Sequence, residues 1–347
     1  MVQMADLVEW GSLDPVDEDA PRVVHDPATG RVFGLSVYED SPEPADLFPL
    51  APSARTFERL VSAREELTSL RGRFADVAAR PGSPAVAEAT ERFRALLAAE
   101  DWGDASDSGA GGGGGADGGS AVPAYWRITS VIRPLALVAG PGRGLLLDLP
   151  AGLLEEAFGA DEVVRLDGSE LPDGLRHEPT RRFLTEVGLP EDALMFGLDG
   201  PEDLFTALAE EDGVAGVGVD PARLFSLGSL VDDIAVYVDG GTGEIYAWYY
   251  AEERLRPLNA DISTLAFTLW LHDRERALDE EHAFSEELHE ELAGAMVAVL
   301  ASVDPVACRD TGEEDDWRYW PETFHDEADG VLQAAPRGKT GGVVRPL

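Results

Sequence analysis

The sequence predicts an α+β protein with a mainly antiparallel sheet and helices packed on it. Two runs in residues 231–249 carry apolar residues at every second position, and the glycine-rich stretch 239–243 separates them. Alternation on both sides of such a stretch is typical of a β-hairpin with one buried and one solvated face. Apolar residues then recur at helical spacing over 265–271. We therefore expect a hairpin, a polar connection and a helix.

The start of this helix has two candidate N-caps, Asp261 and Ser263. Either side chain can accept a hydrogen bond from a backbone N–H of the first turn, which has no partner within the helix. The sequence leaves both open.

Residues 1–102 form a first segment with its own smaller hairpin and helices. After an acidic stretch, residues 23–35 predict strand, turn and strand, followed by a proline-rich polar loop through Pro49. Ser53 and Thr56 are candidate caps of a helix that carries Phe57 to Leu70 and can continue to Phe74, and a second helix is expected over 86–99.

A flexible linker is predicted over residues 103–121, which include five consecutive glycines. Such a composition cannot bury enough apolar surface to offset the entropy lost on ordering. We assign residues 122–332 to the main domain and residues 333–347 to a disordered tail.

The main domain is expected to begin with strands at 128–138 and 145–149, joined by the glycine-rich hairpin 140–144. Further strands are expected at 163–166, 196–198 and 224–230, and helices at 153–158, 179–187 and 285–303. Gly188 with Pro190 beyond it is a typical helix end. An acidic and aromatic element over 315–332 closes the domain.

The hairpin–helix pattern occurs twice. Residues 26–33 align with 239–246, including Asp26 with Asp239 and Thr29 with Thr242, and Ser53 then matches Ser263. In both copies Asp and Gly suit the turn and Thr can hydrogen-bond inside it. This favours a degenerate half-repeat within residues 1–102, although the spacing differs by several residues and a chance likeness of two hairpin–helix units stays open.

The chain is strongly acidic, with 67 Asp and Glu against 27 Lys and Arg and a formal net charge of −40. Such a surface repels nucleic acid and anionic membranes, because Lys and Arg are the residues that neutralise phosphate. The single lysine, Lys339, favours a compositional origin in a high-GC or salt-adapted cell. The alternative is an acidic surface that attracts a basic partner.

Cytoplasmic localisation is expected. The apolar runs are far shorter than the roughly 20 residues that cross a bilayer, and no basic-then-apolar leader opens the chain. The lone Cys308 excludes an internal disulfide and fits a reducing compartment.

Candidate chemistry is sparse. His282, Glu286 and His289 would share one face of a continuous helix, as a metal site requires, but their many glutamate neighbours favour a solvated face. Cys308, in acidic surroundings, should have a raised pKa and be a poor nucleophile. We expect no enzyme activity, cofactor or metal.

Several stretches resemble the SUKH superfamily of bacterial immunity proteins, in particular its family four. They are 181–190, 224–228, 234–239 with 242–246, 257–259 before Leu265 and Phe267, and 317–332. The resemblance implies a curved, mainly antiparallel sheet with packed helices. It also implies a non-catalytic protein that binds and neutralises a polymorphic toxin, often a nuclease or nucleic-acid deaminase.

We therefore predict an immunity protein whose acidic surface covers a basic toxin domain. The alternative is a cytoplasmic scaffold or regulator that uses the same fold for a partner unrelated to a toxin. Candidate contact residues are acidic side chains near the hairpin and the last element, each of which can equally be a solvated surface charge: Asp232, Asp233, Glu252, Glu253, Asp315 and Asp316.

Overall fold

The computed structural model describes residues 7–13, 21–37, 45–102, 122–211, 214, 218–231, 234–282, 284, 288–309 and 318–328. Contacts divide the chain into two compact units, Met1–Pro134 with Ala283–Glu291 (unit 1) and Leu135–His282 with Leu292–Leu347 (unit 2). The protein is α+β, and every strand pair among the described residues is antiparallel. The predicted linker and the predicted tail lie outside the described residues.

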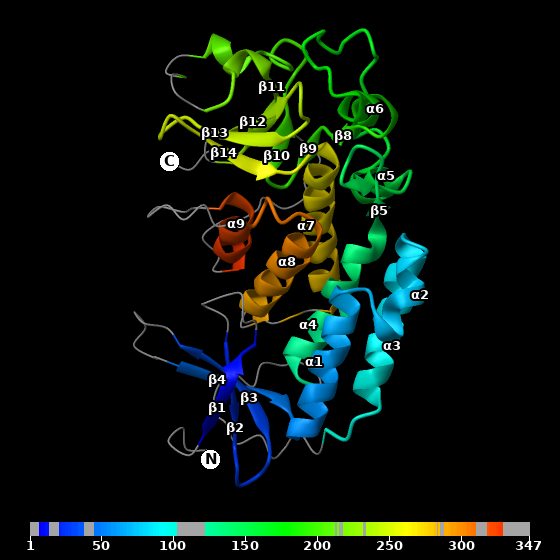
Figure 1. Cartoon of the computed structure of the whole chain (residues 1–347), viewed down its shortest axis with the longest axis vertical. Helices are drawn as coiled ribbons and strands as arrows, with labels where there is room; N and C mark the ends of the chain where they lie inside the picture. The colour runs from blue at the N-terminus through cyan, green and yellow to red at the C-terminus, as the bar shows by residue number, and fades with distance from the viewer. Residues whose placement is uncertain are drawn as a thin grey trace. The chain divides into compact units, whose positions relative to one another are not determined.

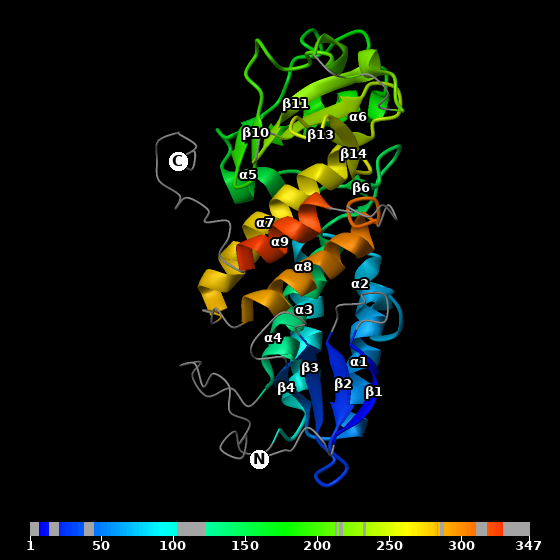
Figure 2. The ribbon, with the colours of Figure 1, turned by 90° about the vertical axis from the view of Figure 1, so that its left-hand side faces the viewer.

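Unit 1 contains a four-stranded sheet in the order β1-β2-β3-β4, with β1 and β4 at its edges (Figure 2). The strands are β1 (Val8–Ser12), β2 (Arg22–His25), β3 (Val32–Val37) and β4 (Ala45–Ala51). The predicted hairpin of β2 and β3 is confirmed. Strand β4 lies where the sequence predicted a polar loop through Pro49, and that prediction was wrong. The proline fits because an edge strand needs hydrogen bonds on one side only.

Helices of unit 1 pack around Trp126, which is fully buried and donates its indole N–H to the Leu50 carbonyl at 2.6 Å. Phe57 and Phe93 lie against the same ring, at centroid distances of 6.4 and 6.3 Å. The helices are α1 (Ala54–Thr68), α2 (Ala75–Ala78), α3 (Ser83–Ala98) and α4 (Ala124–Ile132). Ser53 is the N-cap of α1, accepting from the Thr56 N–H at 3.2 Å. Helix α1 ends at Thr68, so it does not continue to Phe74.

Helix α4 and the 3-10 helix η4 (Arg133–Val138) correct the strand predicted over 128–138. The apolar residues Ile128, Val131, Ile132 and Leu135 stand at i, i+3, i+4 and i+7, the spacing of a helix, which the strand prediction missed. The hairpin at 140–144 is present but short, formed by β5 (Gly140–Pro141) and β6 (Leu147–Asp148).

Unit 2 is built on a six-stranded sheet in the order β14-β13-β12-β11-β10-β9 (Figure 1). Its strands are β9 (Asp192–Ala193), β10 (Phe196–Leu198), β11 (Leu224–Leu230), β12 (Ile234–Asp239), β13 (Ile245–Tyr249) and β14 (Arg254–Asn259). The predicted hairpin is confirmed as β12 and β13. The expected polar connection is instead the edge strand β14, which was missed because Arg254, Arg256 and Pro257 are poor strand formers.

Both faces of this hairpin are buried, so the expectation of one solvated face was wrong. All of β12 is buried, and Trp248 of β13 is 1% exposed. Trp248 and Tyr237 belong to a cluster with Leu208, and Val214 and Val219 pack against it. The segment between β10 and β11 therefore covers the face that the pattern assigned to water.

The helices of unit 2 agree broadly with the sequence. They are α5 (Leu153–Phe158), α6 (Glu178–Glu186), α7 (Ile262–His282), α8 (His289–Val303) and α9 (Tyr319–Ala328). The brief strand near 163 is β7 (Val163–Val164), paired with β8 (Leu189–Pro190). Gly188 ends α6 with φ +86°, as expected. Asp261 is the side chain that caps α7, because its Oδ1 accepts from the N–H groups of Ser263 and Thr264.

Two hairpin turns, one in each unit, have the same hydrogen bonds. The Asp26 N–H donates to the Arg31 carbonyl at 2.9 Å, and the Asp239 N–H donates to the Glu244 carbonyl at 2.8 Å. In each turn the Asp carboxylate also accepts a backbone N–H two residues on. Gly30 and Gly243 have φ of +76° and +82°, a conformation that favours glycine. The Asp, Thr and Gly of both turns therefore have a structural role.

Candidate partner-binding site

The turn between β12 and β13 is fixed by a buried carboxylate. Asp239 Oδ1 accepts from the N–H groups of Gly241 at 2.6 Å and Thr242 at 3.0 Å. Arg223 Nη2 lies 2.7 Å from the same oxygen, and the Asp239 side chain is only 3% exposed. The hydrogen bond to Asp239 raises the pKa of the Arg223 guanidinium above its usual value. This carboxylate is committed to the turn and is not available to a partner.

A second buried carboxylate, Asp304, connects β14 to the end of α8. Its Oδ2 accepts from Asn259 Nδ2 and from the Ala260 N–H, both at 3.0 Å, and its Oδ1 accepts from the Val306 N–H at 3.1 Å. Asn259 in turn accepts the Trp320 indole N–H at 3.0 Å. Asp304 and Trp320 are 0% exposed and Asn259 is 1% exposed. The network therefore ties α9 to the sheet edge.

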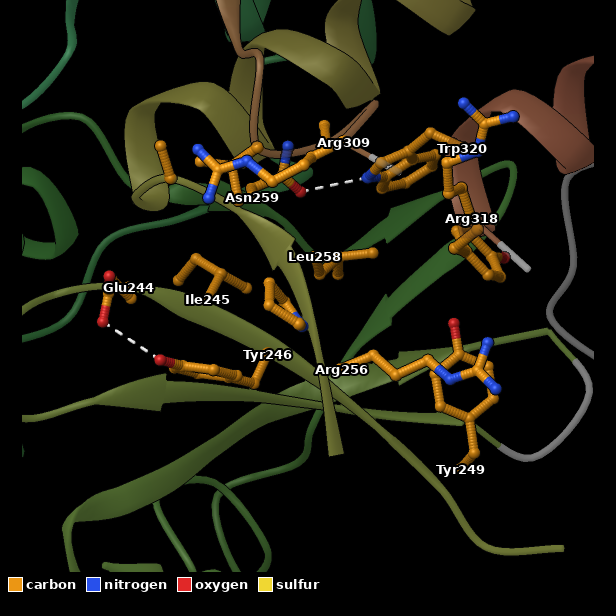
Figure 3. Close-up of a pocket in the computed structure, with 15 residues that line it drawn as sticks. Glu244, Ile245, Tyr246, Tyr249, Arg256, Leu258, Asn259, Arg309, Arg318 and Trp320 are labelled. Atoms are coloured by element: carbon orange, nitrogen blue, oxygen red, sulfur yellow. Dashed lines mark hydrogen bonds between the residues drawn. The ribbon is translucent and has the colours of Figure 1, made fainter. Parts of the chain in front are cut away.

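A pocket of about 190 Å³ lies beside this network, between β13, β14 and the start of α9 (Figure 3). Three arginines line it, Arg256, Arg309 and Arg318, although the chain as a whole is strongly acidic. Figure 3 shows their guanidinium groups apart from one another, and Arg256 lies over the Tyr249 ring at 5.2 Å. The arginines do not form a single anion-binding cluster.

We define the acidic–aromatic face of unit 2 as two tyrosines, the glutamates that accept from them and the two exposed glutamates of the next turn: Tyr246, Tyr250, Glu244, Glu211, Glu252 and Glu253. Tyr246, Trp248 and Tyr250 stand at alternate positions along β13 and just beyond its end. Tyr246 packs against the cluster that contains Trp248, and the Tyr250 ring contacts the Trp248 ring. Tyr250 is 44% exposed, and its hydroxyl donates to Glu211 Oε1 at 3.4 Å. Tyr246 donates to Glu244 at 3.0 Å. The face thus combines exposed aromatic area with several carboxylates.

Tyrosines on this face are protonated at neutral pH. Burial, followed by the hydrogen bond to Glu244, raises the pKa of Tyr246 to about 12. Burial and the nearby Glu211 raise the pKa of Tyr250. Their hydroxyls therefore act as neutral hydrogen-bond donors to the glutamates, and the glutamates supply the negative charge.

Two of the six candidate contact residues are described by the structure. Glu252 and Glu253 are exposed on the turn between β13 and β14, and Glu252 also pairs with Arg256 at 2.9 Å. Asp232, Asp233, Asp315 and Asp316 lie outside the described residues. Tyr250 was not among the candidates from the sequence, because those residues were chosen for their negative charge alone.

The three side chains considered for a metal site do not share one helix. His282 ends α7 and His289 begins α8, while Glu286 lies outside the described residues. In the described part of the chain, no three His, Cys, Asp or Glu side chains form a group that can hold a metal ion. Nor is any described helix both long and apolar enough to cross a membrane.

Cys308 has a raised pKa, as the sequence indicated. Burial is the main cause, the negative charge of Asp304 is the second, and together they raise the thiol pKa to about 12. The thiolate is the reactive form, so it is rare at neutral pH.

We expect Cys308 to react with iodoacetamide at least about a hundredfold more slowly in the native protein than in guanidinium chloride at about pH 8, since unfolding restores an ordinary thiol pKa. Mass spectrometry of the alkylated peptide measures both rates. Native labelling within about tenfold of the denatured rate would contradict this view of the site.

Comparison with models of protein families identifies the family of this chain. The model of the SUKH-4 immunity protein family matches residues 149–326, just over half of the chain. The chain belongs to the SUKH-4 immunity protein family. The SUKH-4 match includes the whole six-stranded sheet, the Asp304 network and the acidic–aromatic face. Comparisons with curated proteins and with solved structures gave no match.

Proposed function

We propose that this protein is a non-catalytic immunity protein that binds and neutralises a polymorphic toxin. Membership of the SUKH-4 immunity protein family carries the proposal, because it indicates toxin immunity in general. An immunity protein acts by occupying its partner, so a buried structural Asp239 and a poorly nucleophilic Cys308 are compatible with this role. The proposed location is the cytoplasm.

The proposed toxin is basic, of the nuclease or nucleic-acid deaminase type. Such enzymes present Lys and Arg to phosphate, and a surface built for phosphate also attracts carboxylates. The net charge of −40 supports this choice, because opposite potentials increase the rate of association and discriminate against other partners.

The acidic–aromatic face is the proposed centre of contact. Aromatic side chains dominate the energy of most interfaces, and Tyr250 is the exposed large aromatic side chain of this face. Glu252 and Glu253 lie beside it in the sequence. Ile234 pairs with Tyr249, so the start of β12 and the end of β13 lie at one end of the sheet. Asp232 and Asp233, which precede Ile234, are further proposed contacts, as are Asp315 and Asp316.

We propose the same domain organisation that the sequence predicts. It consists of an N-terminal segment (1–102), a linker (103–121), a SUKH-like domain (122–332) and a C-terminal tail (333–347). The proposed SUKH-like fold includes a curved sheet. Direct nucleic-acid binding and membrane association are not part of the proposed function.

Coexpression with the product of the neighbouring toxin gene tests the function. We expect the two proteins to copurify and this protein to restore growth of cells that express the toxin. If the toxin neither copurifies nor is neutralised, the proposed function is wrong. Stable copurification with the product of a nearby non-toxin gene would favour a scaffold or regulator instead.

Charge reversal tests the face itself. We expect Glu252→Lys/Glu253→Lys to weaken toxin binding by about tenfold or more, because it places repulsive charges beside Tyr250. Isothermal titration calorimetry at low salt measures the dissociation constant.

The matched control is Asp161→Lys/Glu162→Lys, which makes the same change in net charge at two exposed residues of unit 2. It should change the affinity by less than about threefold. Equal weakening by both pairs would mean that net charge, and not this face, determines binding.

A further inference from the structure

The sheet of unit 1 repeats the β11–β14 part of unit 2 in its irregularities as well as its strand order. Between β1 and β2 the register shifts from Glu9 to Gly11, opposite Val24 and Val23. Between β11 and β12 it shifts from Ser226 to Gly228, opposite Tyr237 and Val236. In both sheets the partner residues of the shift lie two and three positions before the Asp of the turn. The facing, bulged strand has a glycine just after the bulge, Gly11 in β1 and Gly228 in β11.

A second irregularity also coincides. The register of β3 and β4 shifts between Val32 and Phe33, and that of β13 and β14 between Ile245 and Tyr246. These residues are six and seven positions after Asp26 and Asp239. Phe33 then pairs with Pro49, as Tyr246 pairs with Pro257. Bulges are specific local features, so two coincident bulges together with the same turn are unlike a chance similarity of two hairpins.

The helices that follow the two sheets, α1 and α7, also correspond. Their N-caps match with an offset of two residues from the alignment made on the sequence. Ser53, two residues beyond Ala51, caps α1, and Asp261, two residues beyond Asn259, caps α7. Each cap accepts the N–H of a threonine three residues on, Thr56 or Thr264. Ser53 therefore corresponds to Asp261, and its alignment with Ser263 was wrong.

The two sheets differ at one edge. In unit 2, β11 pairs with β10, and an added Cβ at Gly228 would stand 2.2 Å from the Gly197 carbonyl oxygen. In unit 1, β1 pairs with β2 and with no other described strand. An added Cβ at Gly11, the residue that corresponds to Gly228, meets nothing within 4 Å. Among the described strands, none takes the place beside β1 that β10 takes beside β11.

Two apolar side chains of this edge are about half exposed. Val8 and Trp10 are 48% and 45% exposed, and Trp10 stacks on His25 at 4.6 Å. The corresponding residues of unit 2, Phe225 and Leu227, are 8% and 0% exposed. A strand edge that pairs with no further described strand and carries exposed apolar side chains is a site for the addition of a strand.

We propose that β1 is the docking site for an extended segment of a basic partner protein, which adds to the sheet antiparallel to β1 as β10 adds to β11. A basic segment is favoured because the chain carries a net charge of −40. On β1 itself, Glu9 pairs with Arg22 at 3.5 Å and keeps 55% of its side chain exposed. The net charge opposes pairing of two copies of this chain. The site lies outside residues 149–326, so it is additional to the proposed toxin-binding face.

A labelled peptide tests the proposal on the full-length chain. It carries the sequence of residues 194–198, Leu-Met-Phe-Gly-Leu, between two pairs of lysines, and fluorescence anisotropy at low salt measures its affinity. We expect saturable binding that Val8→Ser/Trp10→Ser weakens by at least about tenfold. Leu70→Ser and Leu146→Ser, at other exposed apolar residues, should each change the affinity by less than about twofold.

Two further measurements use the unaltered chain, so they test the proposal even if a variant fails to fold. A peptide with glutamates in place of the lysines should bind at least about tenfold more weakly. Hydrogen exchange of the unaltered chain should show that the basic peptide protects the amides of β1 and leaves those of β14, the edge of the other sheet, unchanged. No saturable binding, or protection elsewhere than at β1, overturns the proposal. So does a dimer of this chain that Val8→Ser/Trp10→Ser abolishes. The assay contains no toxin, so its result is separate from that of the coexpression experiment.

Discussion

Replacing Asp304 with alanine should lower the free energy of unfolding by about 2–5 kcal/mol, the largest stability loss that we expect from a single polar side chain. The variant removes the acceptor of three donors, the buried Asn259 Nδ2, which keeps its bond to Thr268, and the partly buried N–H groups of Ala260 and Val306. Urea denaturation followed by circular dichroism measures the change.

Two companion variants identify the cause. Asp304→Asn keeps one of the two acceptor oxygens and should lose less stability than Asp304→Ala. Asp161→Ala removes an exposed carboxylate and should change the free energy of unfolding by no more than about 0.5 kcal/mol. If Asp304→Ala is as stable as Asp161→Ala, the network does not hold β14 and α9 together.

Gly228→Ala should lower the free energy of unfolding by about 1–3 kcal/mol, because its Cβ has no room. The nearest atom is a backbone oxygen of the neighbouring strand, Gly197 O, at 2.2 Å, and a backbone cannot rotate away as a side chain can. We expect β10 to separate from β11, with faster hydrogen exchange at residues 196–198.

Gly197→Ala is the matched control on the facing strand. Its added Cβ meets nothing within 4 Å, so stability should change by no more than about 0.5 kcal/mol. Equal losses from both variants would indicate a general cost of removing glycine from this sheet. They would also weaken the comparison between Gly228 and Gly11 from which the β1 site is inferred.

Local chemistry made parts of this fold predictable from the sequence. The turns at Asp26 and Asp239 need only an Asp, a Thr and a Gly within five residues, and the cap of α1 needs only Ser53 three residues before Thr56. The antiparallel α+β class and the SUKH-4 family followed from such short stretches.

The sequence was a poorer guide to which residues are buried and which strands lie at a sheet edge. Strands β4 and β14 contain Pro49 and Pro257, which suit an edge but weaken a strand signal. The run at 128–138 was predicted as a strand, although Ile128, Val131 and Ile132 stand at the spacing of a helix. Whether the face with Trp248 meets water depends on Leu208, which lies in a short 3-10 helix (Leu208–Glu210) distant in the sequence.

The candidate site was predictable only in its charge. Glu252 and Glu253 are acidic residues beside a hairpin, which the sequence shows directly. The partnership of Asn259 with Asp304 spans 45 residues, and no local spacing reveals it. Tyr250 became a candidate because its ring is 44% exposed and its hydroxyl donates to Glu211.

The affinity of the purified protein for its toxin domain, measured as a function of salt, tests the central claim most directly. If an acidic surface neutralises a basic toxin, binding should be tight at about 50 mM NaCl and at least about tenfold weaker at about 500 mM, since salt screens exposed charges. Toxin activity should be inhibited in proportion to occupancy. No measurable binding, or tight binding that salt does not change, would contradict the account.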